Sequence, residues 1–221
     1  MHMTDRGLLA LVRHEGLVAG PYLDVKNVWT FGIGHTAAAG PPDPAQMPRG
    51  MPADLDAGIR EAFRLFRADM VAYEAEVLRA VKVPLEPHEF DALVSFHYNT
   101  GGIAKASLTR HLNAGNRAAA AQGFMGWLRP AAIRSRREAE RDLFRDGRYP
   151  TGIIPVWAVD RNGRVDFSRP VRRLTEAEAL ALLRQRMQAA LDTIEAGLER
   201  RRYPNPFFEP QAATAAPTGR R

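Results

Sequence analysis

Apolar residues recur at every third or fourth position over residues 54–81, and this spacing predicts one long amphipathic helix. The repeating positions are Leu55, Ile59, Phe63, Phe66, Met70, Tyr73, Val77 and Val81. At 1.5 Å per residue such a helix would extend roughly 40 Å. The pattern therefore predicts a helix that is longer than a small domain is wide.

Shorter elements are predicted on both sides of this helix. Thr4 can cap a helix that ends near Glu15–Gly16. The turn-forming pair Lys26-Asn27 lies between two β-prone runs, so we expect a small hairpin with strands at Tyr22–Val25 and Val28–Phe31. Five prolines in residues 37–53 indicate a loop. Further helices are expected at Glu86–Tyr98, Ser107–Asn113, Arg117–Leu128 and Ala131–Phe144.

The pattern changes after residue 149. Two β-prone runs flank Asn162-Gly163, which is a strong hairpin signal. Thr175 and Glu178 form the sequence signature of a capping box, and it opens a predicted helix to about Arg202. That helix carries Leu180, Leu183, Met187, Leu191, Ile194 and Leu198 on one face. The four prolines of residues 203–221 predict a disordered tail.

Composition narrows the class of protein. The chain has 221 residues, of which 45% are hydrophobic and none is cysteine, so disulfide frameworks and Cys nucleophiles are excluded. No apolar run approaches the roughly 20 residues of a membrane span, so we expect no stable membrane insertion. The net charge of +6 is compatible with nucleic acid, anionic lipid or cell-wall glycan as partner. Because no zinc-finger, RNP or phosphate-loop motif is present, nucleic acid is the weakest of these.

Three residues near the N-terminus form the candidate site. Glu15 ends the first predicted helix, and Asp24 and Thr30 lie in the following hairpin. A helix end and a facing hairpin can hold two carboxylates across a cleft, as cleavage of a glycosidic bond requires. A hydroxyl such as that of Thr30 can hold the attacking water. His35 is better interpreted as a structural histidine, in a salt bridge or a satisfied hydrogen bond, than as a catalyst.

The ordered motifs resemble the phage-type lysozymes, or endolysins, of glycoside hydrolase family 24. The N-terminal match consists of His14-Glu15-Gly16, Pro21-Tyr22-Leu23-Asp24 and Val28-Trp29-Thr30-Phe31-Gly32-Ile33-Gly34-His35-Thr36. Downstream matches follow in order at Phe90–Phe96, Asn99-Thr100-Gly101, Ser107-Leu108, Leu112–Gly115, Phe124, Trp127, Arg136–Glu140 and Leu143-Phe144. The resemblance covers residues 7–148.

This resemblance implies an α+β fold that is mostly α. It consists of a small N-terminal β-hairpin lobe, a long connecting helix and a helical C-terminal lobe, with glycan in the cleft between them. We expect residues 1–149 to form the lysozyme catalytic domain. Residues 150–202 would be an accessory hairpin plus helix packed on the core, and residues 203–221 a disordered tail. The alternative for the extension is a basic module that adds affinity for the cell wall or a partner.

The resemblance also implies roles for residues. Glu15 would be the general acid, while Asp24 and Thr30 would position or activate the water. Tyr22 and Gly32 would shape the cleft floor and bind substrate. An arginine of the closing helix would pair with the catalytic glutamate, and Arg134, Arg136 and Arg137 compete for this role. No metal or cofactor is expected.

The implied function is a muramidase that cuts the β-1,4 bond between N-acetylmuramic acid and N-acetylglucosamine in peptidoglycan. It would serve host-cell lysis by a phage or phage-derived particle. We expect a monomer that accumulates in the host cytoplasm and depends on a holin to reach the cell wall. A lytic transglycosylase, which needs no water-activating carboxylate, and an inactive glycan-binding module are the alternatives. The presence of Asp24 and Thr30 argues against the transglycosylase, and retention of Glu15, Asp24 and Thr30 argues against the inactive module.

Two segments depart from the family pattern. The proline-rich loop 37–53 follows His35-Thr36, where further hairpin residues are expected, and it is either a lid or a connector. Ala132-Ile133 also replaces the Gly-Leu that often precedes the arginine pair. This second change bears on the geometry of the closing helix and not on activity.

Overall fold

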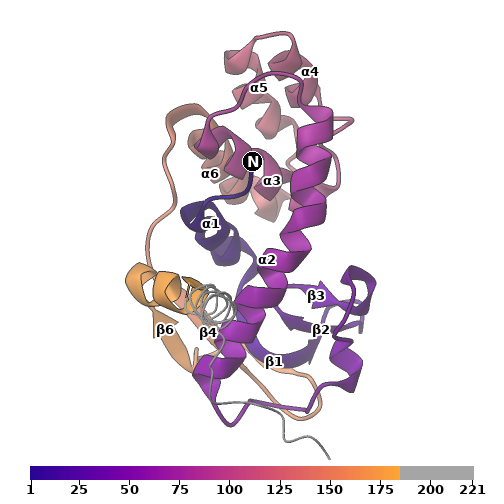
Figure 1. The fold of residues 1–221 in the computed structure, drawn as a ribbon, viewed down its shortest axis with the longest axis vertical. Coiled ribbons are helices and arrows are strands. Elements are labelled where there is room, and N and C mark those ends of the chain that lie inside the picture. Colours follow the sequence, from indigo (N-terminus) through magenta and orange to yellow (C-terminus); the bar gives the residue numbers. More distant parts are fainter. Residues whose placement is uncertain (185–221) are drawn as a thin grey trace, which may run out of the picture. The chain divides into compact units, whose positions relative to one another are not determined.

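The computed structural model describes residues 1–184 (Figure 1). Its helices are α1 (Asp5–Glu15), α2 (Leu55–Ala80), α3 (Pro87–Thr100), α4 (Ser107–Asn113), α5 (Arg117–Gly123) and α6 (Arg134–Asp146). Short 3₁₀ turns are η1 (Ala37–Ala39), η2 (Pro44–Gln46), η3 (Phe124–Gly126) and η4 (Ala131–Ile133). The strands are β1 (Leu17–Leu23), β2 (Trp29–Gly32), β3 (His35–Thr36), β4 (Ile154–Val159), β5 (Val165–Asp166) and β6 (Arg172–Leu174). The predicted α+β class is confirmed.

Helix α2 is the long helix that the apolar spacing predicts. The Asp54 side chain caps it by accepting a hydrogen bond from the Ala57 N–H at 2.9 Å. One part of α2 packs on β1 and β2, and another packs on α3 (Figure 1). Its apolar face is buried at both ends, from Ile59 to Val77. The helix therefore connects the sheet with the cluster of C-terminal helices.

The sheet combines segments that are far apart in the sequence. Its strand order is β3-β2-β1-β4-β5, and β6 pairs with β4. Strands β1 and β2 are antiparallel, whereas β1 and β4 are parallel, with Leu17 opposite Val156 and Val18 opposite Trp157. The hairpin after residue 149 thus continues the N-terminal sheet.

The predicted N-terminal hairpin is present with shifted boundaries. Strand β1 begins at Leu17 and not at Tyr22, and it ends at Leu23. Residues 24–28 form the turn, because the Asp24 Oδ1 accepts the backbone N–H groups of Lys26 and Val28, each at 2.8 Å. Asn27 supplies the left-handed residue of this turn, with φ +58°.

Two predicted helices are divided by the structure. The predicted helix Arg117–Leu128 is split into α5 and η3, and the predicted helix Ala131–Phe144 into η4 and α6. Helix α6 ends at Asp146 and is capped by Gly147, whose φ of +65° is left-handed. Loop 37–53 contains η1 and η2 and no further hairpin.

The extension after residue 149 has the predicted hairpin around Asn162-Gly163, in the form of β4 and β5. Strand β6 was not predicted. The capping box at Thr175 is formed, since its N–H donates to the Glu178 carboxylate at 2.8 Å. Residues 176–184 are helical, and Leu183 is buried in the core. The rest of the predicted helix to Arg202 and the predicted tail 203–221 lie outside the described residues.

No helix within residues 1–184 has both the length and the apolar character needed to cross a bilayer.

Candidate active site

Glu15 is the last residue of α1. The Thr4 hydroxyl caps the start of this helix by accepting the Gly7 N–H at 2.9 Å. At the other end Gly16 adopts a φ of +82°, which ends the helix and leads directly into β1. The Glu15 side chain is 24% exposed. Its carboxylate is therefore held at a helix end where a substrate can reach it.

Asp24 opens the turn of the β1–β2 hairpin, and Thr30 lies near the start of β2. Among the described residues, Oδ1 of Asp24 accepts both hydrogen bonds to this carboxylate, which fixes its orientation. Thr30 is opposite Tyr22 in the β1–β2 register, so their side chains share one face of the sheet. The Thr30 hydroxyl donates to the Val28 carbonyl at 3.0 Å. Its oxygen lone pairs remain able to accept a hydrogen bond.

Tyr22 lies near both candidate carboxylates. Burial raises the pKa of Tyr22 to about 12, and the charges of Glu15 and Asp24 add to this rise. A hydrogen bond from the Gly34 backbone opposes it. Both carboxylates thus lie within electrostatic range of the Tyr22 hydroxyl. The sequence alone places them only in neighbouring elements.

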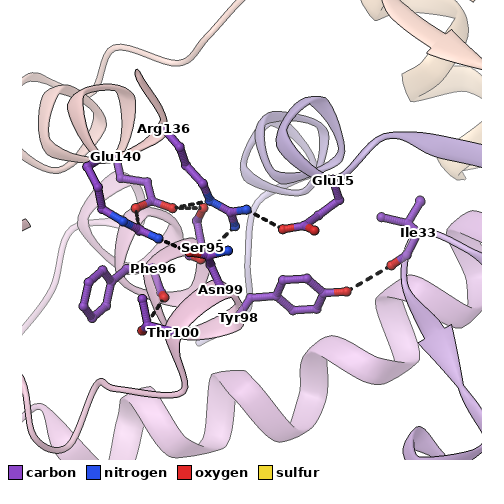
Figure 2. A network of polar contacts seen from close by, with 10 residues as sticks. Glu15, Ile33, Ser95, Phe96, Tyr98, Asn99, Thr100, Arg136 and Glu140 are labelled. Carbon is purple, nitrogen blue, oxygen red and sulfur yellow. Dashed lines mark hydrogen bonds and ion pairs between the residues drawn. The ribbon is translucent and has the colours of Figure 1, made fainter. Parts of the chain in front are cut away.

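Arg136 holds Glu15 in a buried ionic network (Figure 2). Its guanidinium donates from Nη1 to Glu15 Oε1 at 2.5 Å, from Nε to Glu140 Oε1 at 3.0 Å and from Nη2 to the Ser95 carbonyl at 3.2 Å. The Ser95 hydroxyl also donates to Glu140, at 2.7 Å. Arg136 and Glu140 are 7% and 1% exposed. The network fixes the end of α1 to α3 and α6.

The other two candidate arginines have different partners, so Arg136 is the one of the three competing residues that pairs with Glu15. Arg134 is 61% exposed and lies 3.7 Å from Glu138, one turn along α6. Arg137 is buried and donates to Glu140 and to Asn99. Of the three positions on α6, that of Arg136 directs the guanidinium toward Glu15. The local sequence does not show which of the three arginines faces α1.

His14 precedes the acid and lies in a positive environment. Burial lowers the pKa of His14 to about 4, and the charges of Arg136, Arg137 and Arg13 lower it further. The imidazole is therefore neutral near pH 7. A neutral His14 leaves the arginine charge of this region to be balanced by Glu15 and Glu140.

Tyr98 is a site residue that sequence reasoning missed, because it was assigned only to the apolar core of its helix. Its hydroxyl donates to the Ile33 carbonyl at 3.0 Å and so joins α3 to the β2–β3 turn (Figure 2). A β-carbon on Gly34 would stand 2.5 Å from that hydroxyl. A cavity of about 430 Å³ begins here, lined by residues that include Gly34, Thr36, Tyr73 and Tyr98.

The two remaining predicted residues have structural contacts. His35 is 2% exposed, with Nδ1 2.9 Å from the Asp69 carboxylate and Nε2 3.0 Å from the Pro42 carbonyl. Both ring nitrogens thus face acceptor oxygens, as in a structural salt bridge. Gly32 is buried, and a β-carbon there would stand 2.7 Å from that of Ala62 on α2. Gly32 therefore allows a close approach of β2 to α2, and the cleft-floor role that the resemblance implies for it stays a prediction.

Within residues 1–184, no three acidic or histidine side chains gather closely enough to hold a metal ion.

Comparison with known proteins agrees with this geometry. The family model described as Phage lysozyme matches residues 12–140. The chain belongs to the phage lysozyme family. Relatives in this family include the endolysin of Salmonella phage P22, 33% identical over 150 residues, which cover 65% of this chain and 98% of the relative. The SAR-endolysin of Escherichia phage Mu is 33% identical over 149 residues, covering 64% of this chain and 78% of the relative.

Solved structures of an endolysin and of a muramidase domain share the fold. The endolysin from Escherichia coli O157:H7 phage FAHEc1 gives a TM-score of 0.59 at 30% identity, covering 68% of this chain and 98% of that chain. The muramidase domain of SpmX from Asticaccaulis excentricus gives a TM-score of 0.55 at 25% identity, covering 66% and 99%. The predicted resemblance to phage-type lysozymes is thus confirmed.

Proposed function

We propose that this phage lysozyme is a muramidase that hydrolyses the β-1,4 bond between N-acetylmuramic acid and N-acetylglucosamine in peptidoglycan. Its role would be the lysis of a host cell by a phage or a phage-derived particle. The observation that carries the proposal is the Glu15 carboxylate, which Arg136 holds at the end of α1 and which, like Asp24, lies within electrostatic range of Tyr22. Membership of the phage lysozyme family and relatives named as endolysins support the same reaction.

We assign the roles of the three residues from the family resemblance and from the chemistry of glycosides. Glu15, as the carboxylic acid, gives its proton to the glycosidic oxygen as the bond to the sugar C1 breaks. A water molecule attacks C1 from the opposite face. Asp24 accepts one proton of this water, and the Thr30 hydroxyl oxygen accepts a hydrogen bond from it. The products are a chain with a new reducing end of inverted configuration and a chain with a new free hydroxyl.

Substitution of each residue tests these roles. Glu15→Gln should lower the rate of peptidoglycan solubilisation by ~10²–10⁴, which is the usual contribution of general acid catalysis. Asp24→Ala and Thr30→Ala should each lower it as well. The matched control is Glu138→Gln, because Glu138 lies on α6 with 43% of its side chain exposed and outside the site. A folded Glu15→Gln protein with activity near that of the parent would remove Glu15 from the acid role.

We further propose that the enzyme acts as a monomer, accumulates in the host cytoplasm and reaches the cell wall after a holin-type lesion opens the membrane. The endolysin names of its relatives support action at the cell wall. Expression in a bacterium without a holin should be harmless until the membrane is permeabilised, after which the culture should clear. Spontaneous clearing without a holin would contradict this route.

A further inference from the structure

Strands β4 and β5 lie beyond residue 140, where the match to the family model ends. They nevertheless extend the sheet that carries the candidate site, because β4 pairs in parallel with β1. The hairpin also touches the turn of the site, since the Leu23 N–H donates to the Gly163 carbonyl at 2.8 Å, directly before Asp24. The extension is therefore part of the surface around the catalytic hairpin.

The strand register places Trp157 on the same sheet face as the site. Residues opposite each other in paired strands share a face. Trp157 is opposite Val18, whose neighbour Ala19 faces α2, because a β-carbon on Gly58 of α2 would stand 3.4 Å from the Ala19 β-carbon. Thr30 likewise alternates with Phe31, which is opposite His35 on the α2 side of the sheet. The other face packs on α2, as the contact of His35 with Asp69 shows. Trp157 therefore lies on the face of Thr30, on the far side of β1.

Trp157 also lies beside the end of α1. Its indole Nε1 is 3.7 Å from the point where a β-carbon on Gly16 would stand, and Gly16 follows Glu15 in the chain. Phe167 packs edge-on against Trp157, with ring centroids 5.4 Å apart and planes at 65°. Phe167 is 69% exposed, and Trp157 is half-buried. The solvent-accessible aromatic pair thus lies beside Gly16, the residue that directly follows the candidate acid.

We propose that Trp157 and Phe167 form an additional glycan-binding subsite of this lysozyme. The proposal rests on the muramidase function, because the occupant is a sugar unit of the strand that Glu15 cleaves. A pyranose ring presents an apolar C–H face, which an aromatic ring can cover, and polar edges, to which the indole N–H can donate. The site is continuous with the cleavage site across β1.

Binding of defined glycan strands to the full-length Glu15→Gln protein tests the subsite. The probe is a set of uncross-linked strands of at least four disaccharide units prepared from peptidoglycan, titrated by calorimetry. Adding Trp157→Ala should weaken binding roughly five- to tenfold, and adding Phe167→Ala should weaken it roughly threefold. Trp157→Phe, which keeps an aromatic face, should restore most of the affinity. Ile153→Ala is the control, since Ile153 is 54% exposed and directly precedes β4.

A second measurement separates binding from a merely structural role. In the protein with Glu15 intact, Phe167→Ala should raise KM for the same strands several-fold with kcat unchanged. Phe167 is exposed, so this variant should keep the melting temperature even if Trp157→Ala does not fold. Unchanged affinity in both variants, or a fall in kcat with unchanged KM, would overturn the subsite.

Failure of the subsite and failure of the proposed function give different results. If the parent enzyme releases no fragments from peptidoglycan, the proposed muramidase function is wrong, regardless of how the Trp157 variants bind glycan. If the parent enzyme is active and both aromatic variants match it in affinity and KM, only the subsite is wrong.

Discussion

Replacing Arg136 by Met should destabilise the protein, because it leaves a buried carboxylate without one of its cations. Glu140 is 1% exposed and would retain Arg137 and the Ser95 hydroxyl, while Glu15 would lose its only arginine among the described residues. Removing one partner of a buried ion pair typically costs 3–5 kcal/mol, and the retained Arg137 favours the lower end of this range. We therefore expect a loss of about 3 kcal/mol, or roughly 6–12 °C in melting temperature.

Urea denaturation of Arg136→Met and of Arg134→Met measures this difference. Arg134 is the matched control on the same helix, and its exposed pair with Glu138 should contribute at most about 0.5 kcal/mol. Activity measured where both variants are folded should fall only in Arg136→Met, because Glu15 loses its fixed direction. If Arg136→Met were within about 0.5 kcal/mol of the parent, the network around Glu140 would not stabilise the fold as argued.

Three further changes should alter stability. Gly34→Ala places a β-carbon 2.5 Å from the Tyr98 hydroxyl at a φ of +84°, so thermal melting should show a loss of stability of roughly 1–3 kcal/mol. The control Gly40→Ala, whose β-carbon would have no atom within 4 Å, should lose less stability. The pKa of His14 is about 4 in the folded chain, against an ordinary value of 6.5. The free energy of unfolding should therefore fall by roughly 3 kcal/mol as the pH drops from 6.5 to 4. Urea titrations of His14→Gln should lack this pH dependence. A chain that ends after Tyr149 loses the buried strand β4 and should melt at a lower temperature; an unchanged melting temperature would show that the extension is an independent module.

Local signals predicted much of the fold because their physical cause is local. The caps at Thr4 and Thr175 satisfy backbone N–H groups within their own helices, so residue type and spacing are enough to locate them. The 3.6-residue period of α2 likewise depends only on which side of one helix is buried. The candidate pair Glu15 and Asp24 followed from motif order together with the family resemblance.

The interactions that the sequence did not reveal are long-range. Pairing of Leu17 with Val156 joins strands 139 positions apart, and no local pattern encodes that register. Strand β6 is three residues long and forms only because β4 offers it an edge. The choice of Arg136 over its neighbours depends on the rotation of α6 relative to α1. Each of these features needs the positions of two elements, which a single-chain pattern does not contain.

Mass spectrometry of the glycan ends released from purified peptidoglycan tests the central claim most directly. Hydrolysis by Glu15 with a water held by Asp24 and Thr30 should give fragments that end in reducing N-acetylmuramic acid, and the Glu15→Gln protein should release almost none. Fragments that end in 1,6-anhydro-N-acetylmuramic acid would mean that no water attacks C1. That result would contradict the hydrolytic mechanism and favour a lytic transglycosylase.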